Sequence, residues 1–233
     1  MTILGIDTAG RTMSVALLEN DTLLCEQTLA TGLTHSETLL PTVDAVLKAA
    51  GKTCADIDLF GVCAGPGSFT GLRIGLCAVK GLAFPANTPC AAVSTLEALA
   101  WSHAGTGTVV AAQDARRGEV YWAAFDLATH QRITPDTASP VEKIRALAET
   151  CPKPLLFVGD GAYLCESAFS AVPGVLPCPA ALRAARAAGV CLAAKAMAER
   201  GETCPPAALL PSYHRLSQAE RQRAERLAQT TEG

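Results

Sequence analysis

The chain contains 233 residues, of which 49% are hydrophobic, 18% are charged and 5% are aromatic. This apolar fraction excludes a disordered chain, and the length suits two lobes of roughly 100 residues that each have a core. Nineteen basic residues against 22 acidic ones leave a net charge of −3, so we expect any RNA to be held by a partner rather than by this chain.

The first lobe is predicted over residues 1–104, where strand and helix signals alternate. Short apolar runs separated by turn residues predict strands at Thr2–Asp7, Met13–Glu19 and Leu23–Leu29, and buried strands at Leu59–Ala64 and Ala91–Ser94. Helices are predicted at Thr34–Ala50, at Thr70–Phe84 and around Thr95–Ala104. The predicted order is therefore βββαβαβα.

The helix predicted at Thr34–Ala50 carries two local signals. Thr34 and Glu37 have the spacing of a capping box, in which each side chain bonds the other residue's backbone amide. Pro41 removes an interior hydrogen bond, so we expect a kink that turns Leu39 and Leu40 toward a partner helix.

A second lobe is predicted over residues 105–211, and a helical tail over 212–233. Strands are expected at Val109–Asp114, Glu119–Asp126 and Leu155–Val158, and helices at Val141–Glu149, Ala180–Arg200 and Ser217–Ala228. We expect the helix at Ala180–Arg200 to pack back on the first lobe. We expect the charged helix at Ser217–Ala228 to be a solvated surface helix.

The two lobes share a local pattern. An apolar strand ends in an aspartate (Asp7, Asp114), an arginine-containing turn follows (Arg11, Arg117), and a second apolar strand returns. Such a repeat predicts two similar lobes that face each other across a cleft, as in folds that bind a nucleotide between them.

The most informative segment is glycine-rich and lies between a buried strand and a helix. It comprises Gly65, Pro66, Gly67, Ser68, Phe69, Thr70, Gly71, Leu72, Arg73, Ile74 and Gly75. Its backbone amides could cradle an anion, but it has neither a Walker lysine nor the dinucleotide spacing. We favour the alternative that Gly71, Gly75 and Ala78 form a stripe of small residues that allows close approach of another helix.

The ten cysteines are never closer than nine residues apart, which is not the spacing of a zinc site. We interpret them, Cys63 and Cys77 among them, as small core residues. No second histidine follows His35 one helical turn later, so we expect no metal site. The first residues lack a basic leader and no uncharged run is long enough for a membrane helix, so we expect a cytoplasmic protein without membrane contact.

Five segments together resemble the bacterial TsaB family, also called YeaZ. They are Ile6-Asp7-Thr8, Thr34-His35-Ser36-Glu37, Gly65–Gly75, Lys80-Gly81-Leu82-Ala83 and Asp114–Tyr121, and the similarity continues more loosely through Val158–Ala162 and Pro211-Ser212-Tyr213. The resemblance implies an α/β fold of the two-lobed actin-like ATPase (ASKHA, ribonuclease H-like) class, each lobe a mixed sheet with flanking helices. It also implies a role with the catalytic relative TsaD and the ATPase TsaE, which attach a threonylcarbamoyl group to N6 of the adenosine beside the anticodon of ANN-decoding tRNAs.

The resemblance implies that this chain keeps the fold of the catalytic relative but lacks the residues that relative uses for catalysis. The catalytic relative holds its metal with a His-x-x-x-His pair, whereas here Leu39 follows His35, so ATP and metal are expected on partner subunits. In the vestigial nucleotide cleft, Asp7 and Thr8 would meet phosphate or its metal, and Gly159 and Gly161 would approach an adenosine. The turn Asp114-Ala115-Arg116-Arg117 replaces a Ser-Gly-Gly phosphate turn.

Three functional hypotheses follow. The first is a non-catalytic subunit that activates the transferase, binds tRNA only through the complex, and can form a homodimer when alone. Its expected interface comprises Thr34, His35, Glu37, Leu39, Leu40, Gly71, Leu72, Gly75 and Ala78. The second is an independent nucleotide-dependent ATPase or kinase of the same fold. The third is a peptidase, which the missing metal pair disfavours. Ser68 has no base nearby in the sequence, although the partners of a catalytic serine need not be local.

Overall fold

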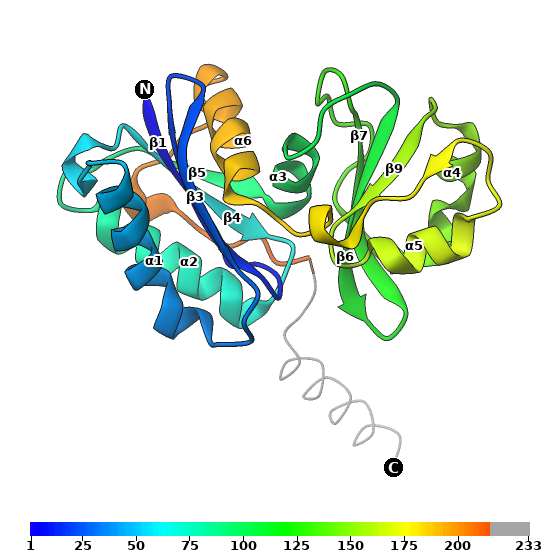
Figure 1. Ribbon diagram of the computed structural model, residues 1–233, viewed down its shortest axis with the longest axis horizontal. Coiled ribbons are helices and arrows are strands. Elements are labelled where there is room, and N and C mark those ends of the chain that lie inside the picture. The colour runs from blue at the N-terminus through cyan, green and yellow to red at the C-terminus, as the bar shows by residue number, and fades with distance from the viewer. Residues whose placement is uncertain (215–233) are drawn as a thin grey trace, which may run out of the picture.

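The computed structural model describes residues 1–214, which form two lobes that each contain a five-stranded mixed sheet (Figure 1). The predicted tail helix at Ser217–Ala228 lies outside the described residues. The first lobe contains β1 (Thr2–Asp7), β2 (Met13–Glu19), β3 (Thr22–Leu29), α1 (His35–Ala49), η1 (Cys54–Asp56), β4 (Leu59–Gly65), α2 (Phe69–Ala83) and β5 (Cys90–Ser94). The predicted order of strands and helices in this lobe is confirmed.

The second lobe repeats the plan of the first. It contains β6 (Thr108–Arg116), β7 (Glu119–Asp126), β8 (Thr137–Pro140), η2 (Val141–Ile144), α4 (Arg145–Thr150), β9 (Leu155–Val158), α5 (Ala162–Phe169) and β10 (Val175–Leu176). The strand orders are β3-β2-β1-β4-β5 and β8-β7-β6-β9-β10, and in each sheet the central strand is antiparallel to one neighbour and parallel to the other. The predicted duplication is therefore present in the topology.

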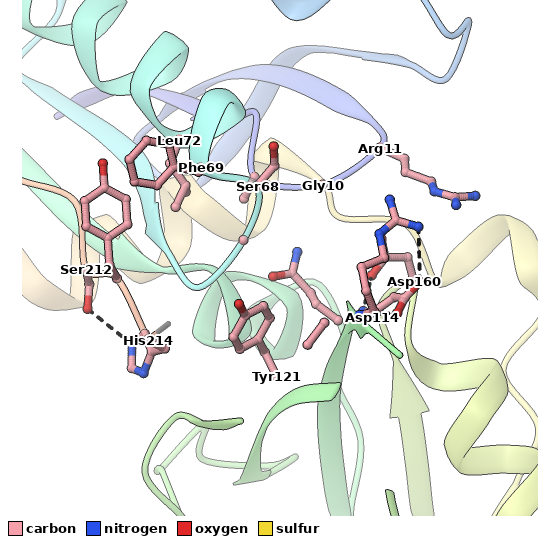
Figure 2. A pocket seen from close by; sticks show the side chains of 16 residues that line it. Gly10, Arg11, Ser68, Phe69, Leu72, Asp114, Tyr121, Asp160, Ser212 and His214 are labelled. Carbon is pink, nitrogen blue, oxygen red and sulfur yellow. Dashed lines mark hydrogen bonds and ion pairs between the residues drawn. The ribbon is translucent and has the colours of Figure 1, made fainter. Parts of the chain in front are cut away.

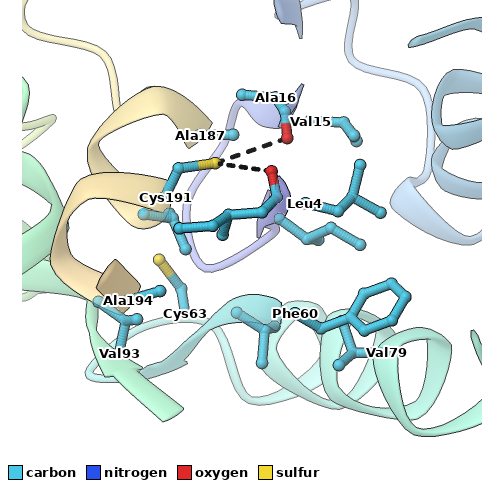
Figure 3. Packing of buried hydrophobic residues seen from close by; sticks show 14 of the residues in the cluster. Leu4, Val15, Ala16, Phe60, Cys63, Val79, Val93, Ala187, Cys191 and Ala194 are labelled. Carbon is cyan, nitrogen blue, oxygen red and sulfur yellow. Dashed lines mark hydrogen bonds between the residues drawn. The ribbon is translucent and has the colours of Figure 1, made fainter. Parts of the chain in front are cut away.

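The first sheet is covered on both faces. Helices α1 and α2 lie side by side on one face, and α6 (Ala187–Glu199) packs on the other (Figure 1). Helix α6 lies very close to β1. A Cβ added to Gly5 would lie only 2.6 Å from Ala187 O and from Cys191 Sγ, so the absence of a side chain at Gly5 allows this approach. Figure 3 shows Ala187, Cys191 and Ala194 on this side of the strands, with Phe60 and Val79 on the other. The chain thus returns to the first lobe through α6, which contacts β1, β2 and β4.

Helix α3 (Thr95–Trp101) connects the two lobes. Its buried residues Leu96 and Leu99 share a core with Val109 and Phe125 of the second sheet. On its other side, the Ala98 carbonyl oxygen lies where a Cβ on Gly189 of α6 would be. The helix is thus packed between the sheet of one lobe and the covering helix of the other.

Several predicted boundaries were wrong. The helix predicted from Ala180 begins only at Ala187, because residues 180–186 contribute a 3₁₀ turn, η3 (Ala180–Leu182), and close the second lobe through a bond from Gly159 N to Arg183 O. The predicted helix Val141–Glu149 is a 3₁₀ turn followed by α4, and α3 ends at Trp101. Cys63 is buried as predicted, whereas Cys77 is exposed on α2.

After α6 the chain stays on the first lobe. Cys204 pairs with Cys90 at the edge of the sheet, and η4 (Pro206–Ala208) contacts α2. The sequence-based domain boundaries had assigned this stretch to the second lobe. No helix within the described residues 1–214 is long and apolar enough to cross a membrane.

Candidate functional site

A cavity of about 380 Å³ lies between the lobes. Figure 2 shows its wall of Gly10, Ser68 and Phe69 from the first lobe facing Tyr121 from the second. Asp114 and Asp160 lie at one end, and Ser212 and His214 lie at the opposite end. The cavity is thus enclosed by the turn β1–β2, the glycine-rich loop, the hairpin β6–β7 and the chain segment that follows η4.

On the first lobe, the glycine-rich loop is bound to the turn that follows β1. Ser68 N donates to Ala9 O at 2.7 Å, and Ser68 Oγ caps α2 by accepting from Gly71 N at 3.3 Å. The Ser68 amide and hydroxyl therefore already have partners within the chain. The loop is built to hold α2 against the turn, which weakens its interpretation as an anion site or as the location of a nucleophilic serine.

The stripe of small residues on α2 has a different contact from the one predicted. A Cβ on Gly71 would overlap the carbonyl oxygen of Thr8, and a Cβ on Gly75 would overlap its hydroxyl oxygen. Thr8 Oγ1 also donates to Gly71 O at 2.7 Å. The prediction that Gly71 and Gly75 face a partner helix is therefore wrong, because both face Thr8 of the same chain. Leu72, another predicted interface residue, is buried in the core of the first lobe. Ala78 is half-buried against the same core.

Asp7 is a buried carboxyl group at the end of β1. One oxygen accepts from Ala9 N at 2.8 Å, while the other has no hydrogen-bond partner among residues 1–214. Burial raises the pKa of Asp7 to about 6, although the Ala9 amide and the Cys63 thiol act in the opposite direction. The carboxyl group lies beneath the cleft and does not line its cavity.

On the second lobe, the hairpin β6–β7 presents carboxylates as well as arginines. Arg116 N donates to Asp114 Oδ1 at 2.7 Å, and its guanidinium lies 3.5 Å from Asp114 Oδ2. Asp160 Oδ1 accepts from Asp114 N at 3.0 Å, and burial raises the pKa of Asp160. Arg116 and Arg117 both have positive φ angles, of 69° and 59°, where an L side chain is disfavoured.

Gly159 and Gly161 were expected where the fold would approach an adenosine. A Cβ on Gly159 would overlap Ala112 O, and one on Gly161 would lie 2.8 Å from the carbonyl carbon of Gln113. Both glycines are therefore required for packing against β6. Gly159 also lines a second cavity of about 230 Å³, which shares Gly10, Arg11, Gln113 and Asp160 with the first.

The start of α1 has an exposed side. Thr34, Glu37 and Leu40 are exposed and His35 is half-buried, with Nε2 3.0 Å from Gly10 O. Leu39 is buried in the core of the first lobe, so its prediction as an interface residue is wrong. The predicted capping box is also absent. The Thr34 hydroxyl accepts a hydrogen bond from Ser36 Oγ and makes no hydrogen bond to the backbone amides at the start of α1.

A groove of about 730 Å³ lies between this start of α1 and helix α2. Its lining includes Leu33, Thr34, Thr70 and Ile74. Leu33, which lines the groove, is 60% exposed, and Leu40 on α1 is 55% exposed. We call the exposed residues Leu33, Thr34, Glu37, Leu40 and Thr70, together with half-buried Ile74, the α1–α2 face.

A cluster of aromatic rings and one arginine was not predicted from the sequence. Tyr213 stacks on Phe69 with ring centroids 4.7 Å apart, and Arg73 lies over Phe69 at 3.9 Å. Arg73 Nε donates to the Tyr213 hydroxyl at 2.9 Å. The pairing joins positions 140 residues apart, and the only local signal was the Pro211-Ser212-Tyr213 motif.

The two lobes, each with the same sheet order, define the class of the protein as an actin-like ATPase (ASKHA, ribonuclease H-like) fold. A dehydratase component A from Acidaminococcus fermentans superposes with a TM-score of 0.53 at 14% identity, over 85% of this chain and 99% of that one. YeaZ from Pseudomonas aeruginosa superposes with a TM-score of 0.73 at 29% identity, over 91% of this chain and 99% of that one.

Sequence comparisons narrow this class to a family. The sequence profile described as TsaD, tRNA N6-adenosine threonylcarbamoyltransferase, matches residues 30–223. The TsaB protein of Bacillus subtilis is 34% identical over 167 residues, which cover 70% of this chain and 73% of that protein. The chain belongs to the TsaB (YeaZ) family of tRNA threonylcarbamoyladenosine biosynthesis proteins.

The TsaB protein of Escherichia coli is 43% identical over 133 residues. This match covers 54% of the present chain and spans about half, 55%, of the length of that relative. The match to the Escherichia coli protein is therefore shorter than the match to the Bacillus subtilis protein.

Proposed function

We propose that this protein is a non-catalytic activating subunit of a tRNA-modifying complex. In this complex a TsaD-like transferase would attach a threonylcarbamoyl group to N6 of the adenosine beside the anticodon of ANN-decoding tRNAs. A TsaE-like ATPase would act with it, and ATP and metal would be held by these partner subunits. Membership of the TsaB family supports the part in threonylcarbamoyladenosine biosynthesis.

The observation that carries the proposal is the α1–α2 face. Exposed Leu33 lines the groove beside α2 and Leu40 is exposed on α1, and large exposed apolar side chains are typical of protein–protein contacts. The groove is formed within one lobe, so a partner helix could dock without separating the lobes. In the absence of the transferase, the same face would allow two copies of this chain to associate.

The residues that would be needed for catalysis support a non-catalytic role. Leu39, one turn after His35, is 1% exposed and packs in the lobe core, so this position cannot supply a second metal-binding imidazole. In the cleft, Asp114 and Asp160 line the cavity together with Arg11 and Arg116, and Arg116 is paired with Asp114. The two carboxylates offset the charge of the two arginines, so the cavity has little net positive charge with which to attract a triphosphate.

The alternative is an independent ATPase or kinase. It is favoured by one observation, the two adjoining cavities between the lobes. The two proposals predict different behaviour of the isolated chain, since an independent enzyme would turn over nucleotide without partners.

Reconstitution separates the two proposals. The isolated chain, the transferase with the ATPase, and all three together would be assayed for ATP hydrolysis and for modified adenosine in an ANN-decoding tRNA. We expect modification only when this chain is added and no hydrolysis by the chain alone. Full modification without it, or catalytic hydrolysis by the isolated chain, would refute the activating role.

A further inference from the structure

We propose that Tyr213 positions Arg73 on the outer side of α2, where the guanidinium receives a carboxylate from a docking partner protein. This inference rests on the proposed function, because it assigns a polar anchor to the α1–α2 face. It gives a role to the Pro211-Ser212-Tyr213 motif, which the activating role leaves unexplained.

The chain segment that carries Tyr213 is fixed on the glycine-rich loop. Ser212 N donates to Ala64 O at 2.7 Å, and Ser212 O lies where a Cβ on Gly65 would be. Gly65 has a φ of +135°, which an L side chain rarely adopts, so a glycine is needed for this contact. Leu209, upstream in the same segment, is fully buried. Tyr213 therefore stands on a fixed backbone.

The side chains around Arg73 restrict its orientation. One face of the guanidinium lies 3.9 Å from the Phe69 ring centroid, and the Tyr213 centroid is 5.9 Å away. The bond from Nε to the Tyr213 hydroxyl, at 2.9 Å, fixes the rotation of the guanidinium plane. Within residues 1–214, neither terminal NH₂ group of Arg73 has a hydrogen bond or an ion pair.

The two terminal NH₂ groups of Arg73, which have no partner within the described part of the chain, suit a carboxylate. Two NH₂ groups can bind both oxygens of one Asp or Glu side chain, and such charge-assisted pairs are stronger than neutral ones. An arginine already held in place loses less rotamer freedom on binding than a mobile one. The cluster is thus preorganised for an acidic residue on a partner.

A protein carboxylate fits this surface better than an RNA phosphate. Among residues 1–214, the hollow beside Arg73 is lined by Phe69, Thr70, Ile74 and Cys77, with no second basic residue. RNA-binding surfaces combine several cationic side chains, and this chain has a net charge of −3. A single arginine beside apolar side chains is the composition of a protein interface.

The experiment measures the affinity of the full chain for the TsaD-like transferase by calorimetry at low and high salt. We expect Arg73→Gln to weaken binding about tenfold or more and to reduce its salt dependence. Tyr213→Phe keeps the stacked ring but loses the hydroxyl, so a loss of about threefold is expected. In the Arg73→Gln background, Tyr213→Phe should have no further effect, since it acts through Arg73.

The matched control is Arg145→Gln, because Arg145 also lies over an aromatic ring, that of Phe169, at 5.4 Å, but on α4 of the second lobe. It should bind like the wild type, and all variants should retain the wild-type circular dichroism spectrum. Wild-type affinity of Arg73→Gln, or full additivity of the two substitutions, would overturn the inference while leaving the activating role intact. Loss of tRNA binding by Arg73→Gln with unchanged transferase affinity would also overturn it, in favour of an RNA contact. A wild-type chain that does not bind the transferase would refute the proposed function itself.

Discussion

The carbonyl oxygen of Thr8 occupies the place of the missing Cβ of Gly71, and the Thr8 hydroxyl donates to the Gly71 carbonyl oxygen at 2.7 Å. The turn after β1 and the first turn of α2 are therefore in backbone-to-backbone contact. This contact sets the position of one wall of the cleft relative to the helix that forms part of the α1–α2 face.

Gly71→Ala should destabilise the fold by about 1–3 kcal/mol, because the added methyl group forces the helix away from Thr8. Gly81→Ala is the matched control on the same helix, since a Cβ there meets nothing within 4 Å. It should be stabilising by up to about 1 kcal/mol. Urea unfolding measures the unfolding free energy of both variants. Equal values would show that the turn containing Thr8 moves to accommodate the added methyl group.

The same packing changes the expectation for Gly75→Glu. From the sequence this substitution is expected to block docking while the fold largely survives. In the structure a side chain at Gly75 would overlap Thr8 Oγ1, so the variant would perturb the lobe itself. An exposed residue is needed to test the interface.

Leu40→Glu provides that test. Leu40 is 55% exposed on α1, so the charge can remain in water in the isolated chain and the fold should persist. On docking, the carboxylate would be buried without a partner, and binding should fall at least about a hundredfold. Co-purification with the TsaD-like transferase measures this, with Leu182→Glu, 53% exposed at η3, as the control. Equal loss of binding in both variants would place the interface elsewhere.

Asp7 should make the stability of the protein depend on pH. Its carboxyl group has a pKa of about 6 in the folded chain against 3.8 without the burial, so the folded state holds the proton more tightly. Below 3.8 the group is neutral in both states and carries no penalty. As the pH rises from there through 6, the unfolded state ionises first and stability falls, by about 3 kcal/mol in total.

Asp7→Asn should remove this dependence. The amide can still accept from Ala9 N, and its own cost of burial does not change with pH. The difference in unfolding free energy between variant and wild type should therefore move in favour of the variant by about 2 kcal/mol between about pH 4 and about pH 7, which is most of the total. Denaturant unfolding across this range checks it, with exposed Asp44→Asn as the control. If this difference does not change with pH, the pKa of Asp7 is not raised in the folded chain and the prediction is wrong.

The isolated chain should bind ATP weakly or not detectably by calorimetry. Asp114 and Asp160 line the cavity, and Arg116 is paired with Asp114. Asp114→Asn removes one repelling charge and releases Arg116, so any measurable affinity should increase several-fold. Micromolar affinity of the wild type, with catalytic hydrolysis, would contradict this prediction and favour an independent enzyme.

The sequence predicted the elements that repeat and the strands that are buried. The strand Leu155–Val158 was predicted with its observed bounds, and the order in the first lobe was correct. Both rely on short continuous apolar runs bounded by turn residues, and the length and flanking residues of such runs favour a buried strand over a helix.

The missed features depend on contacts between distant residues. The run from Ala180 reads as helix, but Arg183 instead bonds Cys178 O and pairs with Glu166, so α6 begins only at Ala187. The Arg73–Tyr213 pair leaves no local pattern for the same reason. The role of Gly71 was misassigned because a stripe of small residues indicates a close approach without identifying the neighbour.

The placement of α6 has a consequence for how the chain emerges from the ribosome. All strands of the first sheet have been synthesised by Ser94, yet the helix that covers one of its faces ends at Glu199. During this interval the sheet face that contains Gly5 and Gly61 is uncovered, whereas the strands of the second lobe all lie within residues 108–176 and can pair earlier. The lobe that begins the chain is thus finished last, and a nascent fragment that stops before α6 carries an open sheet face.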